Sequence, residues 1–340
     1  MSKRPKGAPA RQTAAPAKVT VPVSKSRAFV WPLLLLVVVA TIGGAIALWP
    51  TPQGAVRGQN GEPDIVTRVE SPYNDITVYR EAGGNYLLSF GAKRLHYIES
   101  AINPNDELDL PIVYTHAMTA GLAYAANIDS AMIIGLGGGR TAWYHHKSVP
   151  TLDFTAVELD PEVVHLAGRY FGVHPEPNFT IANEDGRVWL ARTDKTFDII
   201  LVDAYRGAFV PFHLLTTEFY KLVAAHLKPG GVAVQNVEPS TMLFDSAVAT
   251  IKAAFAHVVF VRAAGNIVIL AYNGPEKDEA TLQKIAAERQ TKYRFRYSLP
   301  EILTHRYQPT WNEKTAALTD DFAPVEYLKA IARHNEKQAE

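Results

Sequence analysis

Short apolar runs alternate with amphipathic segments through the second half of the chain, from Ser130 onward. Several runs have the length and β-branched content of buried strands, at residues 131–137, 153–160, 179–185, 197–204, 231–237, 257–265 and 266–273. Between them, apolar residues recur at helical spacing in residues 162–171, 213–227 and 240–255. Strands that alternate with helices predict a mostly parallel sheet covered on both faces. The last two runs have no helix between them and predict an antiparallel edge hairpin.

Residues 75–126, which precede this region, show a different pattern of apolar and polar positions. Residues 75–98 alternate apolar and polar positions on both sides of Gly83 and Gly84, which predicts a β-hairpin or meander. After Pro111, helical spacing predicts a helix over residues 111–126. These patterns divide the chain into a linker, hairpin domain and connecting helix at 50–128, an α/β domain at 129–275 and a helical extension at 276–340.

Residues 28–49 carry no charge over 22 positions, which is long enough for a helix to cross a hydrocarbon core of about 30 Å. Trp31 and Trp49 stand near its two ends, where an aromatic belt places them. A cleaved signal peptide is the alternative, because Ala45-Ile46-Ala47 resembles a cleavage site. The run exceeds the usual signal-peptide core of about 7–15 residues, so we expect a retained transmembrane helix.

Charge and cysteine usage narrow the function. The formal net charge is zero, but the disordered tail predicted at residues 1–27 holds seven of the 34 basic residues and no acid. The rest of the chain is therefore acidic, which argues against nucleic-acid binding. With no cysteine, disulfides and thiolate metal sites are excluded. We expect a small-molecule ligand and no metal.

A glycine loop ends the first strand of the predicted α/β domain, with Gly135 and then Gly137, Gly138 and Gly139 in "GLGGGR". Glycine allows positive φ and lets a ligand approach main-chain N–H groups, although a tight strand-to-helix turn needs glycine for packing alone. Glu158 ends the second strand about 20 residues later, where a carboxylate binds a ribose diol. The two features together predict a nucleoside site.

Two further acids stand at strand ends. Asp185 follows the third strand, where it either faces a ligand or caps a helix. Asp203 ends the apolar run "FDIILVDA" without an obvious helix directly after it. A buried carboxylate is costly without a partner, so we expect Asp203 to face the ligand.

In combination these residues resemble the spermidine synthase family of polyamine aminopropyltransferases, and in particular its membrane-attached bacterial members. The resemblance covers about residues 70–275 and rests on six motifs in order, namely "SPYNDITVYRE", "LPIVYTHAM", "GLGGGR", "VELDPEVV", "EDGRVWL" and "ILVDAY". The resemblance implies a Rossmann-like transferase fold with a small N-terminal β-domain. The six motifs are specific for the superfamily but less specific for one reaction.

The resemblance also implies roles for these residues. The donor would be decarboxylated S-adenosylmethionine, held by the glycine loop, with Glu158 on its ribose and Asp185 near its adenine. Asp203 would take the proton of the attacking amine, and Tyr114 and Tyr73 would position that small amine acceptor. Further substrate contacts are considered at Tyr205 and His213, which follow the strand at 197–204, and at Gln235, near the end of the strand at 231–237. For His213 the alternative is capping or packing. A homodimer is the oligomeric state that we consider for this protein.

Two positions depart from the family pattern. Where spermidine-forming members have carboxylates that contact cationic amines, this chain has Arg140 and Arg206. A guanidinium repels a polycation, so these arginines either select an anionic group, such as the carboxylate of intact S-adenosylmethionine, or point outward and pair with surface acids such as Glu81 or Glu184.

Three functions stay open at this point. Aminopropyl transfer with altered acceptor choice leads, methyl transfer from S-adenosylmethionine is the second, and a non-catalytic nucleoside-binding protein is the third. Localisation is open too. The basic tail places the folded part outside the inner membrane, whereas supply of the donor favours the cytoplasmic side.

Overall fold

The computed structural model describes residues 64–91, 97–206, 209–239 and 243–321. The predicted tail at 1–27 and the predicted transmembrane helix at 28–49 lie outside these residues. Among the described residues, no helix is both long and apolar enough to span a membrane.

The N-terminal sheet is antiparallel and has the order β1-β2-β3-β4. Its strands are β1 (Asp64–Glu70), β2 (Asp75–Arg80), β3 (Tyr86–Phe90) and β4 (Tyr97–Ile102). The predicted meander around Gly83 and Gly84 is confirmed by β2 and β3, which pair from Ile76 with Phe90 to Arg80 with Tyr86. β1 was not predicted, because most of its side chains are exposed and give no apolar alternation.

The helix predicted over residues 111–126 is wrong in one respect, since two short helices replace it. They are α2 (Tyr114–Met118) and α3 (Gly121–Tyr124). Between them, the N–H groups of Thr119 and Ala120 bond to carbonyls three residues back, and the Thr119 hydroxyl also donates to the His116 carbonyl. Gly121 then passes so close to β9 that an added Cβ would lie 2.8 Å from a Val234 methyl. Packing on the sheet therefore overrides the helical periodicity.

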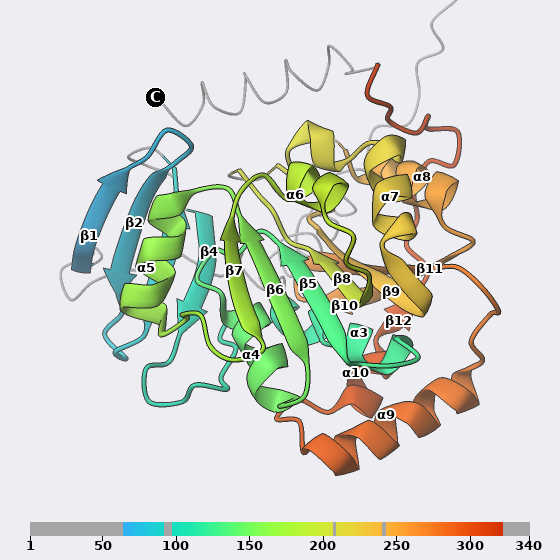
Figure 1. Ribbon diagram of the computed structural model, residues 1–340, viewed down its shortest axis with the longest axis horizontal. Coiled ribbons are helices and arrows are strands. Elements are labelled where there is room, and N and C mark those ends of the chain that lie inside the picture. Colours follow the sequence, from blue (N-terminus) through green and yellow to red (C-terminus); the bar gives the residue numbers. More distant parts are fainter. Residues whose placement is uncertain (1–63, 92–96, 207–208, 240–242, 322–340) are drawn as a thin grey trace, which may run out of the picture. The chain divides into compact units, whose positions relative to one another are not determined.

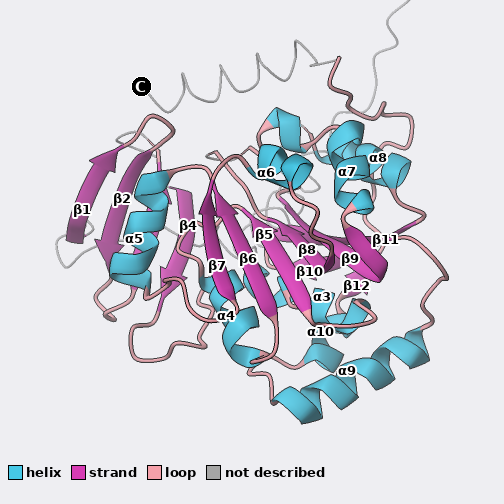
Figure 2. Ribbon diagram, in the orientation of Figure 1, coloured by secondary structure: helices cyan, strands magenta, loops and turns pink. Residues whose placement is uncertain are grey.

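The large sheet has the strand order β12-β10-β11-β9-β8-β5-β6-β7 (Figures 1 and 2). Its parallel part confirms the predicted strands, as β5 (Ser130–Ile134), β6 (Asp153–Glu158), β7 (Phe179–Asn183), β8 (Phe197–Val202) and β9 (Leu227–Val237). β5 lies between β6 and β8, so the chain reverses its strand order there. Ligands of such sheets bind at this point, beyond the carboxyl ends of the strands.

The antiparallel pair predicted near residue 265 is confirmed as β10 (His257–Ala263) and β11 (Asn266–Tyr272). It is not a simple edge hairpin, because β11 pairs with β9 and β10 pairs with the short strand β12 (Arg306–Tyr307). The described part of the predicted helical extension contains α9 (Glu279–Tyr293) and α10 (Leu299–Thr304), and then β12 and a stretch without helix to residue 321.

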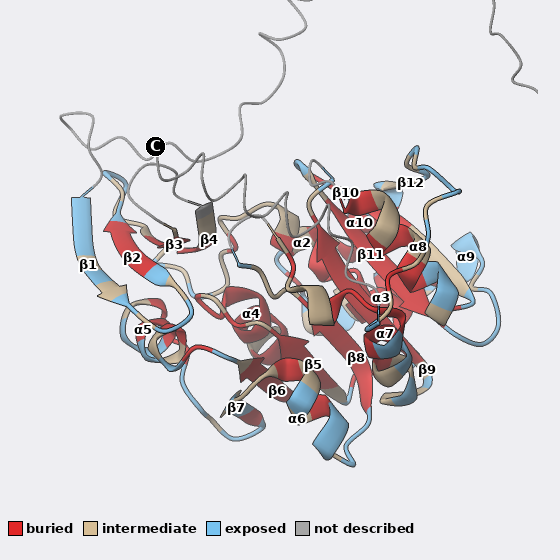
Figure 3. Cartoon of the chain, turned by 90° about the horizontal axis from the view of Figure 1, so that it is seen from above, coloured by how far each residue is buried: buried red, intermediate tan, exposed pale blue. Residues whose placement is uncertain are grey.

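Helices cover both faces of the large sheet (Figure 1). The faces are separated by the two-residue alternation of the strands, because Ile133 packs in one apolar cluster and Met132 and Ile134 in the other. Figure 3 shows how completely β5, β6 and β8 are buried. One layer contains α4 (Arg140–Ser148), α5 (Pro161–Phe171), α9 and α10, and the other contains α6 (Gly186–Arg192), α7 (Thr217–Ala225) and α8 (Phe244–Ala254), with a short 3-10 turn η1 (Phe212–Leu214) before α7.

The turn before β2 ties the small sheet to the large one. The Ser71 hydroxyl donates to the Asp160 carboxylate at 2.5 Å, and the Asn74 side-chain amide donates to the same oxygen at 3.2 Å. Asp160 is 1% exposed and also caps α5 by accepting from the Glu162 N–H. Because Asp160 stands two residues after Glu158, the small sheet is anchored beside the predicted ribose acid.

Candidate active site

The glycine loop after β5 divides into positions fixed by packing and one open position. Gly135 has φ +89°, and an added Cβ would lie 2.5 Å from the Asp203 carbonyl oxygen. An added Cβ on Gly138 or Gly139 would also lie within 3 Å of neighbouring side chains. Gly137 has φ +54°, and beyond its chain neighbours an added Cβ would meet only the Glu99 carbonyl oxygen within 4 Å, at 3.9 Å. Packing therefore explains three of the predicted glycines, and Gly137 alone leaves room for a ligand.

Glu158 faces this loop, as its position at the end of β6 predicts. Its carboxylate accepts from the N–H groups of Leu136 at 2.7 Å and of Asp160 at 2.9 Å. Burial raises the pKa of Glu158, while these N–H groups act in the opposite direction. The carboxylate is thus held by the backbone at the point where β5 turns into its loop.

Asp203 follows β8 on the other side of β5, and its N–H donates to the Ile134 carbonyl. Its carboxylate accepts from the Tyr114 hydroxyl at 3.1 Å and from the Asn236 side-chain amide at 2.9 Å. Burial raises the pKa of Asp203, and both hydrogen bonds oppose this rise. The pKa of Tyr114 is itself raised well above its usual value by burial and by Asp203, so its hydroxyl stays protonated as a donor. The predicted pair of Asp203 and Tyr114 is therefore in contact.

Asn236 was not among the predicted site residues, whereas its neighbour Gln235 was. Gln235 is 2% exposed, and its side chain is occupied by the Tyr220 hydroxyl at 2.7 Å and the Asn236 carbonyl at 2.6 Å. The prediction that Gln235 faces the acceptor is therefore wrong. Asn236 points to the opposite face of β9, where it contacts Asp203 and accepts from the Asn266 amide at 2.8 Å. The alternation of side chains along a strand places the two amides on opposite faces, but it does not say which face meets Asp203.

Asp185 and His213 form a pair at the neighbouring strand end. Asp185 caps α6 by accepting from the Val188 N–H at 2.9 Å, so the capping alternative is confirmed. Its other oxygen lies 2.8 Å from the His213 Nε2, and this contact is the main cause of the lowered pKa of Asp185. His213 therefore lies beside the predicted adenine acid rather than beside Asp203.

The remaining predicted substrate residues differ in placement. Tyr205 lies beside Asp203, and its hydroxyl donates to the Asn236 carbonyl at 2.8 Å. Arg206 is exposed, in a backbone bridge with Phe209. Tyr73 is 39% exposed in the turn that contacts Asp160. Neither Arg206 nor Tyr73 lines the cavities described below.

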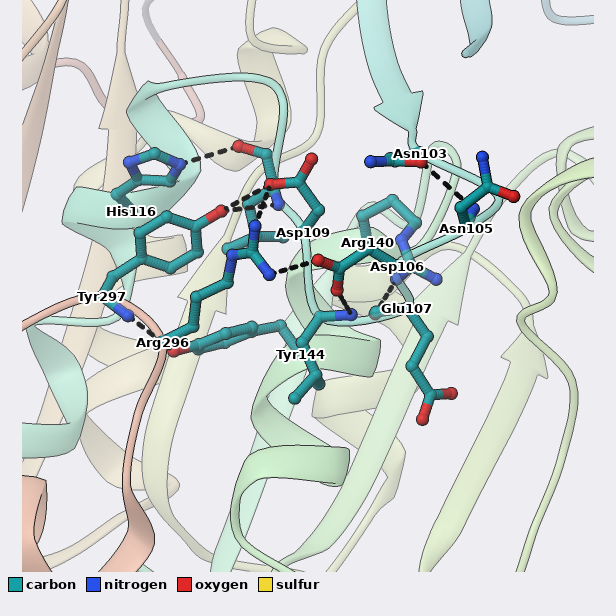
Figure 4. A network of polar contacts seen from close by, with 12 residues as sticks. Asn103, Asn105, Asp106, Glu107, Asp109, His116, Arg140, Tyr144, Arg296 and Tyr297 are labelled. Atoms are coloured by element: carbon teal, nitrogen blue, oxygen red, sulfur yellow. Dashed lines mark hydrogen bonds and ion pairs between the residues drawn. The ribbon is translucent and has the colours of Figure 1, made fainter. Parts of the chain in front are cut away.

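Arg140 points inward, so the alternative of an outward guanidinium paired with a surface acid is wrong. It is 3% exposed, and its two terminal nitrogens donate to the carbonyl of Phe171, at 3.0 Å, and to the carbonyl of Glu107. Figure 4 shows the second contact, with the Glu107 side chain directed away from Arg140. The sequence gives no signal for it, because the loop that supplies the carbonyl lies more than 30 positions upstream.

The loop contacted by Arg140 is also held from the C-terminal side (Figure 4). Arg296 forms ion pairs with Asp106 and, at 3.4 Å, with Asp109. The Tyr297 hydroxyl donates to Asp109 at 3.0 Å and accepts from the Leu110 N–H at 2.8 Å. The loop between β4 and α2 is therefore fixed on two sides.

Two small cavities adjoin Asp203 and Tyr205. The first is lined by residues of β4, of the segment before α2, of α2, of the glycine loop and of α4, and by Asp203 after β8. Its lining includes Glu99, Tyr114, Leu136 and Arg140. The second is mostly apolar and is lined by Tyr205, Phe209, Val210, Leu215, Val237, Glu238, Leu243 and Ala247. The site thus has one polar compartment beside the glycine loop and one apolar compartment beyond Tyr205.

Comparison with known proteins identifies the family. The spermine/spermidine synthase domain matches residues 113–274. The polyamine aminopropyltransferase of Vibrio vulnificus is 30% identical over 281 residues, which cover 79% of this chain and 93% of the relative. The chain belongs to the polyamine aminopropyltransferase family. It is accordingly a transferase.

Solved structures support the same fold for this polyamine aminopropyltransferase family member. A probable spermidine synthase from Corynebacterium glutamicum is 20% identical with a TM-score of 0.59, covering 76% of this chain and 97% of that one. A spermidine synthase in complex with the transition-state analogue AdoDATO is 18% identical with a TM-score of 0.59, covering 72% of this chain and 85% of that one. Among the described residues, no three His, Asp or Glu side chains are grouped to hold a metal ion.

Proposed function

We propose that this chain transfers an aminopropyl group from decarboxylated S-adenosylmethionine to a small amine, with Asp203 as the general base. The spermidine synthase solved with AdoDATO supports this choice of donor. The observation that carries the proposal is Asp203 itself, a partly buried carboxylate held by Tyr114 and Asn236 at the end of β8.

The chemistry follows from the charges in this site. The amine nitrogen attacks the carbon bonded to the sulfonium, the C–S bond breaks, and its electron pair stays on sulfur as a neutral thioether. The nitrogen then carries one proton too many, and the Asp203 carboxylate accepts it. A carboxyl whose pKa is raised by burial holds that proton better than one at its usual value. Glu158 would hold the ribose and so fix the sulfonium near Asp203.

Asp203→Asn tests this role. It keeps the shape of the side chain but removes the base, so we expect turnover to fall by about 10² to 10⁴-fold while donor binding changes less than about twofold. Release of the adenosyl thioether measures turnover, and calorimetry measures binding. The control is Asp153→Asn, an exposed acid at the opposite end of the sheet. Unchanged turnover, or turnover lost only in proportion to binding, would contradict the role of base.

Methyl transfer from S-adenosylmethionine is a second candidate, and the buried Arg140 favours it because the intact donor carries a carboxylate. The acceptor product distinguishes the two reactions, since one adds a methyl group and the other an aminopropyl group. Mass spectrometry of the acceptor after reaction with each donor decides between them.

We further propose that residues 28–49 anchor the enzyme in the inner membrane. The uncharged run and the basic tail before it support this anchor. The tail favours an outer location for residues 50–340, whereas donor supply favours the cytoplasm. A reporter fused after residue 340 shows on which side of the membrane the C-terminus lies.

The predicted homodimer is tested separately, by sedimentation of the detergent-extracted protein.

A further inference from the structure

Two side chains of opposite charge line the polar cavity beside Asp203. Glu99 comes from β4, and Arg140 opens α4 directly after the glycine loop. Among the described residues no ion pair joins them, and each has a buried polar atom without a hydrogen-bond partner, the Oε1 of Glu99 and the Nε of Arg140. Buried charges are usually paired, so this arrangement needs a partner of its own.

The positive charge of Arg140 is incompletely balanced. Its hydrogen bonds go to two backbone carbonyls rather than to a carboxylate. Asp106, Glu107 and Asp109 lie close enough to favour the charged form, yet burial outweighs them and lowers the pKa of Arg140 to about 10. Two of these acids are already paired with Arg296. An anion at the Arg140 Nε would therefore be stabilised.

The negative charge of Glu99 is equally isolated. Burial raises the pKa of Glu99 well above its usual value, and the carboxylates of Asp203 and Glu238 add to that rise. No described cation is hydrogen-bonded to Glu99. A cationic group entering the cavity would therefore be stabilised by Glu99 and Asp203 together.

The cavity also lies where the end of a donor would reach. Leu136, which lines it, donates its N–H to Glu158, and Asp203 lines its other side. If Glu158 holds the ribose and Asp203 faces the reacting carbon, the chain beyond the sulfonium extends between Glu99 and Arg140. That chain ends in an ammonium group alone in the decarboxylated donor, and in an ammonium and a carboxylate in S-adenosylmethionine.

We propose that the site also uses S-adenosylmethionine with its carboxylate intact, and that Glu99 binds the ammonium and Arg140 the carboxylate. This inference rests on the proposed function and changes only the donor. The acceptor nitrogen attacks the side-chain carbon bonded to sulfur, and the C–S electron pair leaves with the adenosyl thioether. Asp203 takes the amine proton. The group transferred is then 3-amino-3-carboxypropyl.

The test begins with the unmodified protein. Calorimetry with each donor should show S-adenosylmethionine binding at least about tenfold more tightly than its decarboxylated form, because one charge-assisted contact is added. Mass spectrometry of diamines incubated with S-adenosylmethionine should show the aminocarboxypropyl product.

Variants of Arg140 and Glu99 then test which residue binds the carboxylate and which binds the ammonium of the donor. Arg140→Gln should remove the preference for S-adenosylmethionine, because the affinity for that donor should fall by at least about tenfold when its carboxylate loses the guanidinium. Glu99→Gln should weaken both donors, since both carry the ammonium. Arg192→Gln, an exposed residue paired with Glu184, is the control and should change neither. Thermal unfolding checks that Arg140→Gln still folds, and Glu99→Gln and the unmodified protein decide the question if it does not.

The outcomes separate the two proposals. Tighter binding of the decarboxylated donor, with an aminopropyl product alone, overturns the inference and leaves the proposed function intact. A methylated acceptor, or no transfer from either donor, overturns both. The aminocarboxypropyl product with donor preference lost in Arg140→Gln supports the inference, and an aminopropyl product from the decarboxylated donor in the same enzyme supports the proposed function.

Discussion

Replacing Asn236 by Leu removes the amide that stabilises the charged form of Asp203. This N–H group lies 2.9 Å from the carboxylate, and a hydrogen bond to a charged group contributes about 1.5–3 kcal/mol. One pKa unit corresponds to about 1.4 kcal/mol, so the pKa of Asp203, already raised by burial, should rise by a further one to two units. The Asp203 carboxylate is then protonated at a higher pH on acidification. If Asp203 is the base, as proposed, the acid limb of the rate profile moves upward in pH by that amount.

The assay is kcat/KM for thioether release measured across pH. The control is the double variant Tyr220→Phe/Gln235→Leu, which replaces the buried hydrogen bond between α7 and the other face of β9. Removal of both partners is nearly neutral for stability, and the acid limb should stay in place. An Asn236→Leu enzyme with a lower rate but an unmoved acid limb would refute the reasoning, because loss of folded protein lowers the plateau without moving the midpoint.

Two other predictions concern the frame of the site. Gly135→Ala should destabilise the fold by about 3 kcal/mol or more, because its Cβ would meet the Asp203 carbonyl, whereas Gly137→Ala should cost only about 1–2 kcal/mol and weaken donor binding. Denaturant unfolding and calorimetry compare the pair, and equal stability losses would contradict the assignment of Gly137 to the ligand side. Ser71→Ala should cost about 1.5–3 kcal/mol, since it removes a hydrogen bond to the buried Asp160. A melting temperature unchanged from the unmodified protein would show that this contact does not anchor the small sheet.

The central part of the parallel sheet was predictable because β5, β6 and β8 are buried over most of their length. β8, for example, is buried at every position, and an apolar run bounded by polar residues shows this in the sequence. The strand ends were equally readable, so Glu158 and Asp203 could be placed at one edge of the sheet before their contacts were known. Local patterns therefore give the scaffold and the carboxylates it presents.

Side-chain direction and distant contacts were not predictable in the same way. Choosing between Gln235 and Asn236 requires knowing which face of β9 meets Asp203, and composition favours neither amide. The inward position of Arg140 depends on a carbonyl of Glu107, which the fold brings across from another element. The break between α2 and α3 depends on the proximity of Val234 to Gly121. Each of these requires the tertiary arrangement.

The alternation along β9 makes the chemistry of this enzyme sensitive to chain length. A single-residue insertion between Lys228 and Val232 that preserved strand pairing would move Gln235 into the place of Asn236, so that a longer amide would stand against the Asp203 carboxylate. An insertion in this segment would thus change the pKa of Asp203 without replacing any side chain of the proposed donor site.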